Sequence, residues 1–165
     1  MQDSSLPYSA IIESPIGSLG LKILNDKLIK IDFLANTKNQ LIEPATPLEK
    51  EVIKQLNHYF NDSTFKFDLP IELQGSEFQL RVWQAMQEIA PSKTLSYGSL
   101  AQRLNTSARA IGNACRRNPI PIIIPCHRIV AVNSMGGFNG AREGHPLAIK
   151  TWLLQHEAAI CSKVS

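Results

Sequence analysis

Three chemically active side chains follow one another at Cys126, His127 and Arg128. A cysteine thiolate is a strong nucleophile, and a neighbouring base or cation lowers the cost of forming it. Adjacent side chains of an extended chain point to opposite sides, so His127 would reach Cys126 only across a sharp bend or through a water molecule. Glu157 is the acid that we expect to orient the imidazole. These residue types predict nucleophilic chemistry at Cys126.

The segment before this cysteine is apolar and rich in proline. Pro119, Pro121 and Pro125 alternate with isoleucines between Asn118 and Cys126. Proline excludes a helix, cannot donate to a sheet, and drives the preceding residue toward extended geometry. We therefore expect a stiff, buried, extended run that ends at the thiol.

Two short helices are predicted upstream of this segment, at residues 97–104 and 107–117, with a polar turn between them. This is the outline of a helix-turn-helix. The second helix contains small residues, so a large partner can approach its backbone closely. It also carries Arg109, Arg116 and Arg117, which can meet phosphates or bases. The pair of helices therefore favours contact with nucleic acid.

The charge distribution supports the same partner. Residues 1–75 contain seven lysines, no arginine and ten acidic residues, whereas residues 76–165 contain three lysines, seven arginines and four acidic residues. Arginine is suited to bidentate phosphate contacts and to stacking on bases. A partner rich in phosphate is therefore expected for the second part of the chain, although a solvated basic surface would have the same composition.

Two domains are predicted, with a boundary near residues 69–75. Residues 1–75 read as a small α/β domain: strands at 17–24 and 27–33 joined by a turn at Asn25–Asp26, a helix that begins after Thr46, and a further strand at 65–69. His58 is expected to be a packing or surface histidine. Residues 76–165 read as a mainly α domain, with a helix that begins after Ser76.

The last helix is predicted at residues 147–157, followed by a frayed tail at 158–165. The candidates for its packed positions are Leu147, Trp152, Leu153 and Leu154.

Several classes of protein are disfavoured. No apolar run approaches the ~20 residues of a membrane span, and no secretory signal is visible at the amino terminus. Cys115, Cys126 and Cys161 are odd in number and widely spaced, which favours reduced thiols in the cytoplasm over a disulfide framework. The histidines form no zinc-binding cluster with the cysteines, so no metal is expected.

Residues 76–157 resemble the carboxy-terminal domain of the O6-alkylguanine-DNA alkyltransferases, also called methylated-DNA–protein-cysteine methyltransferases. Residues 1–75 resemble the variable amino-terminal domain of that family only in size and in the order of strands and helix. The similarity runs through Phe78 to Trp83, Thr94-Leu-Ser-Tyr-Gly98, Arg109-Ala-Ile-Gly112, Asn118-Pro119, Ile124-Pro-Cys-His-Arg-Ile-Val130 and Lys150-Thr-Trp-Leu-Leu-Gln-His-Glu157.

The resemblance implies a winged-helix-like helix-turn-helix domain that repairs DNA. Cys126 would take the alkyl group from guanine O6 in duplex DNA, once per molecule and without a cofactor. His127 would be the base, acting through a water and held by Glu157. Asn118 would tie the DNA-reading helix to the active-site loop. The chain is expected to act as a monomer.

The remaining roles also follow from the resemblance. Tyr97 would assist rotation of the nucleotide and protonation of the leaving guanine, with Lys150 close by. Arg109 would fill the gap left by the flipped base, while the small-residue helix lies in the minor groove. The implied DNA contacts are Ser107, Ala108, Arg109, Arg116 and Tyr97, and the implied pocket residues are Cys115, Pro121, Ile129, Phe138 and Asn139.

The chain departs from the family pattern after the active-site motif. Phe138 and Asn139 stand in a loop where the family usually has Gly-Tyr-x-Gly-Gly, and an extra stretch at about 141–146 precedes the last helix. The amino-terminal zinc ligands of some members have no counterpart. These changes bear on the range of alkyl groups accepted.

Two other functions are compatible with the residues themselves. A cysteine peptidase or acyltransferase could use Cys126, His127 and Glu157, and would turn over on an acyl substrate without needing basic helices. A DNA-binding regulator could carry Cys126 as a structural residue.

Overall fold

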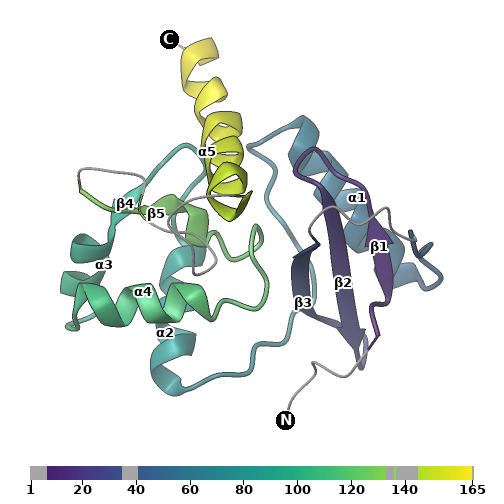
Figure 1. Cartoon of the computed structure of the whole chain (residues 1–165), viewed down its shortest axis with the longest axis horizontal. Coiled ribbons are helices and arrows are strands. Elements are labelled where there is room, and N and C mark those ends of the chain that lie inside the picture. Colours follow the sequence, from purple (N-terminus) through teal and green to yellow (C-terminus); the bar gives the residue numbers. More distant parts are fainter. Residues whose placement is uncertain (1–6, 35–40, 133–135, 137–144, 165) are drawn as a thin grey trace. The chain divides into compact units, whose positions relative to one another are not determined.

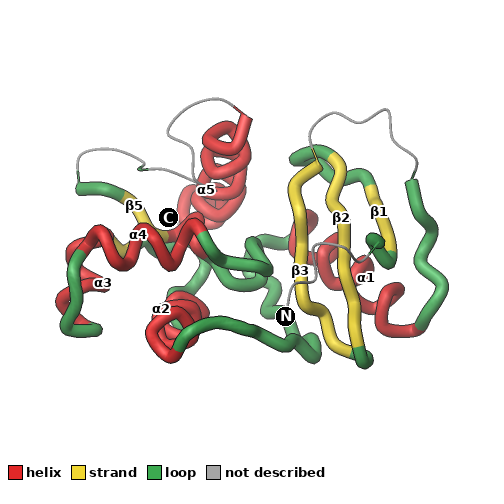
Figure 2. The backbone as a smooth tube through the Cα atoms, turned by 60° about the horizontal axis from the view of Figure 1, so that its bottom comes forward, coloured by secondary structure: helices red, strands yellow, loops and turns green. Residues whose placement is uncertain are grey.

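The structure is a computed structural model, which describes residues 7–34, 41–132, 136 and 145–164; side chains are described for all of these except 145 and 159–164. The chain divides into two compact units, Met1–Leu73 and Gln74–Ser165. The first unit contains a sheet and one long helix, and the second is mainly helical (Figures 1 and 2). The fold class predicted from the sequence is confirmed.

The sheet of the first unit is antiparallel, with strand order β1-β2-β3. Its strands are β1 (Ala10–Ile12), β2 (Ser18–Leu24) and β3 (Lys27–Leu34). Asn25 and Asp26 join β2 to β3 with φ angles of 53° and 58°. Two successive left-handed residues make a tight hairpin turn whose twist matches that of the strands, and short polar side chains tolerate this geometry. The predicted hairpin is confirmed.

Helix α1 (Pro47–Asn61) lies against one face of this sheet (Figure 2). Thr46 accepts a hydrogen bond from the Glu49 amide, and the Glu49 carboxylate accepts one from the Thr46 amide, which together make a capping box at the predicted start of the helix. The buried side chains of α1 that face the core include Val52, Leu56 and Tyr59. These side chains form the packed face of α1.

The strand predicted at residues 65–69 is wrong. The Gln55 side chain bonds both backbone groups of Asp68, accepting from its N–H at 2.9 Å and donating to its C=O at 3.0 Å. Because these groups are satisfied by a side chain, they join no ladder, and only Ile71 forms an isolated bridge with Leu28. His58 is a surface histidine, as expected, and its ring stacks on Phe65 at 4.3 Å between centroids.

The second unit contains α2 (Glu77–Gln87), α3 (Tyr97–Arg103), α4 (Ala108–Arg116) and α5 (His145–Val164). A short parallel ladder joins β4 (Leu95–Ser96) to β5 (Ile129–Val130), and a 3₁₀ turn, η1, spans Cys126–Arg128. Trp83 of α2 is buried, and its Nε1 donates to the Ala114 carbonyl at 2.9 Å. This bond connects α2 to α4 in the core of the unit.

The turn between α3 and α4 ends one helix and begins the next within four residues. Asn105 has a left-handed backbone (φ 57°), and the Thr106 amide donates to the Ala101 carbonyl at 2.9 Å. This is a Schellman-type helix end. Ser107 then caps α4 by accepting from the Ala110 amide. The predicted helix-turn-helix is therefore set by local hydrogen bonding.

The packed face of α5 differs from the prediction. Leu153 is buried as expected, but Leu147, Trp152 and Leu154 are only half-buried. Fully packed positions also include Ile149 and the polar residues Lys150 and Glu157. The hydrophobic pattern does not identify these two positions because Lys150 and Glu157 are polar. They are buried where they form hydrogen bonds with residues 127–129, next to Cys126.

The helical backbone of α5 continues to Val164, so the expectation of a frayed tail from residue 158 is wrong. Among the helices of the described residues, none combines the length and the apolar character needed to span a bilayer.

Candidate active site

The proline-rich segment is buried but not extended, so this part of the prediction is wrong. The chain turns at Ile122–Ile123, and Ile122 has a φ of 77°. Asn118 closes the turn: its Nδ2 donates to the Ile124 carbonyl at 2.8 Å, and its Oδ1 accepts from the Ile120 amide at 3.0 Å. The prolines exclude a helix, but they do not prevent a turn at Ile122 and Ile123, neither of which precedes a proline.

Asn118 follows α4 directly, after the C-cap residue Arg117. The Ile124 carbonyl accepts from the Cys126 amide at 2.8 Å as well as from Asn118. One side-chain amide therefore links the end of α4 to the residue before the Pro125–Cys126 step.

Cys126 begins the 3₁₀ turn η1 and is 6% exposed. Burial raises the pKa of its thiol, an effect that the neighbouring Asn118 and Lys150 oppose but do not cancel. The resting side chain is therefore a protonated thiol, and a base must remove its proton for reaction.

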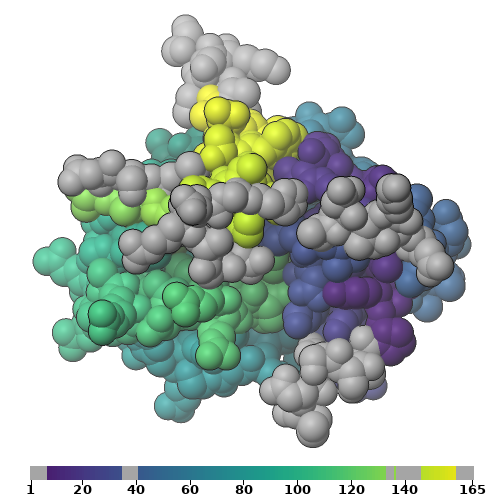
Figure 3. Space-filling model, in the orientation of Figure 1, coloured from purple at the N-terminus to yellow at the C-terminus, as the bar shows by residue number. Residues whose placement is uncertain are grey.

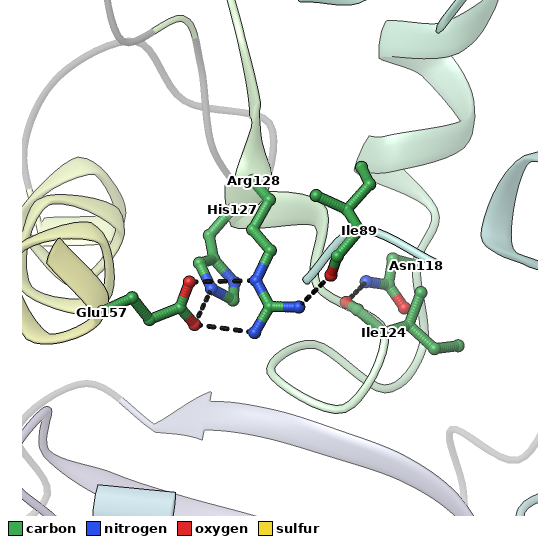
Figure 4. A network of polar contacts seen from close by, with 6 residues as sticks. All are labelled: Ile89, Asn118, Ile124, His127, Arg128 and Glu157. Carbon is green, nitrogen blue, oxygen red and sulfur yellow. Dashed lines mark hydrogen bonds and ion pairs between the residues drawn. The ribbon is translucent and has the colours of Figure 1, made fainter. Parts of the chain in front are cut away.

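His127 and Arg128 converge on one carboxylate (Figure 4). His127 Nε2 lies 2.8 Å from Glu157 Oε2. Arg128 donates to both carboxylate oxygens, from Nε at 2.9 Å and from Nη2 at 2.9 Å, and its Nη1 donates to the Ile89 carbonyl at the end of α2. These hydrogen bonds hold the His127 imidazole and the Arg128 guanidinium, both in the 3₁₀ turn, against Glu157 of α5.

The charge of Glu157 is stabilised by these partners. Burial alone would raise the pKa of this carboxyl, but the hydrogen bonds and charges of His127 and Arg128 outweigh burial and hold it well below its usual range. Glu157 is 1% exposed and remains ionised at neutral pH. An ionised carboxylate only accepts hydrogen bonds, so His127 Nε2 carries the proton and donates a hydrogen bond to Glu157, which sets the tautomer of the histidine.

That tautomer leaves His127 Nδ1 as a buried acceptor. Nδ1 has no hydrogen-bond partner among the described residues. Burial lowers the pKa of His127, although Glu157 opposes this effect, so the ring is neutral at physiological pH. A neutral imidazole with one oriented, unprotonated nitrogen is equipped to accept a proton.

Lys150 of α5 and Cys126 affect each other's pKa electrostatically. Lys150 is fully buried, and its Nζ donates to the Ile129 carbonyl at 2.7 Å and lies 5.9 Å from the centre of the Tyr97 ring. Burial lowers the pKa of Lys150 to about 8, and the fields of Cys126 and Cys115 oppose this shift. The amine can therefore change its charge near neutral pH.

Tyr97 begins α3 and is half-buried. Gly136 packs against it: a Cβ at this glycine would lie 2.9 Å from Tyr97 Cε2 and 3.2 Å from its hydroxyl oxygen. The backbone of Gly136 is also left-handed (φ 77°), so a larger residue would be strained as well as crowded. Gly136 was not among the predicted site residues, although a glycine in the loop after the cysteine motif was a usable signal.

The predicted pocket residues are only partly brought together. Cys115 of α4 is half-buried with Sγ 3.7 Å from Met86 Sδ, and burial, followed by the field of Cys126, raises the pKa of its thiol. Pro121 and Ile129 are buried on either side of Cys126 in the chain. Phe138 and Asn139 lie outside the described residues, as does most of the extra stretch at 141–146.

Four of the five predicted DNA contacts are exposed, and the fifth, Tyr97, is half-buried. Ala108, Arg109 and Arg116 of α4 and its N-cap residue Ser107 are these four. Helix α4 lies at the surface of the second unit (Figure 3). Gly112 is in the same helix, and a Cβ built there would meet no atom within 4 Å. A glycine inside a helix lowers its stability, so the open space beside Gly112 fits a backbone that another molecule approaches closely.

Arg128 was identified only as a cation beside the thiol, yet it binds Glu157 and the Ile89 carbonyl just after α2. A charged residue in an isoleucine-rich buried segment was the available signal, because a buried charge needs a partner. Among the described residues, no three His, Cys, Asp or Glu side chains are grouped as ligands of a metal ion.

Comparison with known proteins covers both units. Residues 77–159 match the model of the "6-O-methylguanine DNA methyltransferase, DNA binding domain", and residues 8–73 match that of the "6-O-methylguanine DNA methyltransferase, ribonuclease-like domain". The methylated-DNA–protein-cysteine methyltransferase of Methanosarcina barkeri is 40% identical, over 91% of this chain and 96% of that protein. The corresponding Methanosarcina acetivorans protein is 36% identical, over 92% of this chain and 99% of the relative.

Solved structures agree with these matches. O6-methylguanine methyltransferase of Mycobacterium tuberculosis superposes with a TM-score of 0.77 at 33% identity, covering 90% of this chain and 91% of that one. Mycobacterium tuberculosis OGT in complex with DNA gives a TM-score of 0.76 at 34% identity with the same coverage. The family models and the near full-length relatives together show that this chain belongs to the methylated-DNA–protein-cysteine methyltransferase family.

Proposed function

We propose that this protein repairs DNA by moving the alkyl group of O6-alkylguanine in duplex DNA onto Cys126. The observation that carries the proposal is the buried Cys126 thiol, which adjoins a neutral His127 in the chain. The ionised Glu157 holds the proton of His127 on Nε2, so Nδ1 is unprotonated and can accept a proton. Family membership supports this reaction over the peptidase and the non-catalytic regulator.

The reaction begins with a proton transfer. His127 Nδ1 takes the thiol proton of Cys126 through one bridging water, and the carboxylate of Glu157 stabilises the imidazolium that forms. The thiolate then attacks the alkyl carbon, the S–C bond forms, and the C–O6 bond of guanine breaks. The electron pair of that bond stays with the guanine, which takes up a proton.

Tyr97 and Lys150 are the groups that we assign to the leaving guanine. Lys150 is placed to hold a positive charge near the thiolate and the Tyr97 ring, and with a pKa of about 8 it is charged at neutral pH. Tyr97 supplies a hydroxyl for protonation and assists rotation of the nucleotide. The alkylated sulfur is a thioether with no carbonyl for water to attack, so each molecule acts once and needs no cofactor.

The DNA is bound through α4. We propose that Ser107, Ala108 and Gly112 let the helix enter the minor groove, where Arg109 fills the gap left by the flipped base. Arg116 contacts the backbone of the duplex. Asn118 then couples the end of this helix to the loop of Cys126.

Cys115, Pro121 and Ile129 line the pocket for the alkylated base. Residues 76–165 bind DNA and transfer the alkyl group, and residues 1–75 form a separate domain. The protein acts as a monomer in the cytoplasm, where thiols are kept reduced.

A stoichiometry assay tests this function. The protein is incubated with duplex oligonucleotide that carries one O6-methylguanine, and the remaining lesions are counted against the protein added. We expect one lesion removed per molecule, with no added cofactor. The Cys126→Ala variant should bind the duplex with wild-type affinity and remove none.

Each alternative predicts a different result. A peptidase or acyltransferase would turn over repeatedly on an acyl ester and leave the lesion intact. A DNA-binding regulator would bind the duplex and leave the lesion intact in the wild-type protein too.

A further inference from the structure

Ile122 has an unusual backbone for its residue type. Its φ is 77°, in the left-handed region, and its side chain is 2% exposed. In the described part of the chain, the other non-glycine residues with such a backbone are the short polar residues Asn25, Asp26, Ser92 and Asn105. Short polar side chains tolerate this geometry, whereas a β-branched residue there is strained.

The strained residue lies inside the turn that shapes the loop of Cys126. On either side of Ile122, the Ile124 amide donates to the Ile120 carbonyl at 2.9 Å, which closes the turn. The Ile124 carbonyl then accepts from both Asn118 Nδ2 and the Cys126 amide, each at 2.8 Å. The reversal of the chain at Ile122 brings these groups together.

The buried side chain explains how the strain is retained. Ile120 and Ile124 on either side are fully buried, and Ile122 is nearly so. Burial of an isoleucine side chain releases enough free energy to offset an unfavourable backbone angle. Glycine would occupy the same angle freely but would lack the side chain, so the isoleucine acts as an anchor and not as a turn former.

We propose that Ile122 is a positioning residue for Cys126: its anchored left-handed turn holds the Ile124 carbonyl where Asn118 and the Cys126 amide meet, and so sets the position of the reacting sulfur. This inference rests on the proposed alkyl transfer to Cys126. Ile122 touches neither the sulfur nor the DNA in this account, and it acts only through the backbone of the loop.

A pair of substitutions separates the backbone from the side chain. Ile122→Ala loses the anchor but keeps a Cβ that disfavours φ of 77°, so the loop relaxes and Cys126 is misplaced. Ile122→Gly loses the same anchor but adopts this φ without strain. We measure the single-turnover rate of alkyl transfer at saturating methylated duplex, and separately the affinity for that duplex.

We expect the glycine variant to transfer faster than the alanine variant, whereas glycine is usually the more damaging substitution. Transfer by the alanine variant should be slower than by the glycine variant by about tenfold, the population ratio that the backbone strain implies. Affinity for the duplex should change less than about twofold in either variant. An alanine variant that transfers as fast as the glycine variant, or faster, overturns the inference.

Ile123 provides the matched control. It is half-buried in the same turn, and it is not among the residues with a left-handed backbone. There glycine should be no better than alanine, so the same glycine preference at both positions would also overturn the inference. Failure of the wild-type protein to transfer would instead refute the proposed function, which keeps the two failures distinct.

Loss of a buried isoleucine could unfold the variants, so circular dichroism precedes the rate measurements. The comparison is then repeated in a Ser92→Gly background. Ser92 is a half-buried residue with φ of 69°, and glycine there should stabilise the fold. If the glycine variant stays unfolded in this background while the alanine variant folds, the inference fails.

Discussion

Replacing Glu157 by glutamine tests the charge network around His127. The carboxylate is 1% exposed, receives two hydrogen bonds from Arg128 at 2.9 Å, and lies 2.8 Å from His127 Nε2. Glutamine has a similar shape but no charge, so it leaves the buried guanidinium without its counter-ion. Removing one partner of a buried pair costs about 3–5 kcal/mol. For a chain of this size we expect Tm to fall by about 6–20 °C.

The same substitution should slow alkyl transfer. Glutamine can present an N–H to His127 Nε2 and so stabilise the wrong tautomer, and it cannot stabilise the imidazolium. Loss of an oriented base lowers rates by about 10²–10⁴-fold. Quench-flow transfer from a methylated duplex measures this rate, and affinity for the duplex should be unchanged.

The pH dependence of the free energy of unfolding tests the ionised state of Glu157 independently. The pKa of Glu157 is depressed in the folded protein, so its contribution to stability is fully present above the unfolded pKa of about 4.3 and is lost as pH falls toward the folded value. The difference in unfolding free energy between wild type and Glu157→Gln should therefore shrink below about pH 4.

Glu88→Gln is the control for this experiment, because Glu88 is exposed in the same unit. It should shift Tm and the transfer rate little. A Glu157→Gln variant that matches this control in both stability and rate would refute the role of the network.

Three further predictions concern other parts of the second unit. Gly112→Ala should stabilise the fold by about 0.5–1 kcal/mol, because its Cβ meets no atom, but should weaken binding to duplex DNA; unchanged or tighter binding would argue against close approach at α4. Arg109→Ala should slow repair of duplex DNA far more than transfer from the free base O6-methylguanine, and equal effects on both substrates would count against its role in base flipping. The pKa of Lys150 is lowered to about 8, so between about pH 8 and 10 the unfolded state binds more protons than the folded state. The free energy of unfolding should therefore rise with pH across this window more in wild type than in Lys150→Met. The same pH dependence of this free energy in both proteins, measured by urea unfolding, would contradict this.

Much of the fold could be predicted from local sequence signals. The hairpin at Asn25–Asp26, the capping box at Thr46 and the turn at Asn105 depend on short polar residues whose local hydrogen bonding and backbone tolerance are known. Such features need no tertiary information. Residues 65–69 show where local signals fail. The Gln55 side chain bonds the backbone of Asp68 in place of a neighbouring strand, and nothing in the sequence of residues 65–69 reveals this contact.

The candidate site was predictable in its residue types but not in its geometry. Cys126, His127 and Glu157 were identified from the sequence, and the structure brings the last two into contact. The course of the proline-rich segment was mispredicted as extended, because the turn at Ile122 depends on long-range burial that overrides local preference. The double contact of Arg128 with Glu157 likewise depends on how α5 packs.

The central claim, transfer of an alkyl group to one sulfur, is tested most directly by peptide mapping. Trypsin cleavage after Arg117 and Arg128 places Cys126 in the peptide 118–128, apart from Cys115 and Cys161. After incubation with duplex DNA that carries O6-methylguanine, mass spectrometry should show one methyl group in place of one hydrogen on this peptide, in an amount equal to the lesions removed. A methyl group on another peptide, or loss of the lesion with peptide 118–128 unmodified, would contradict the account.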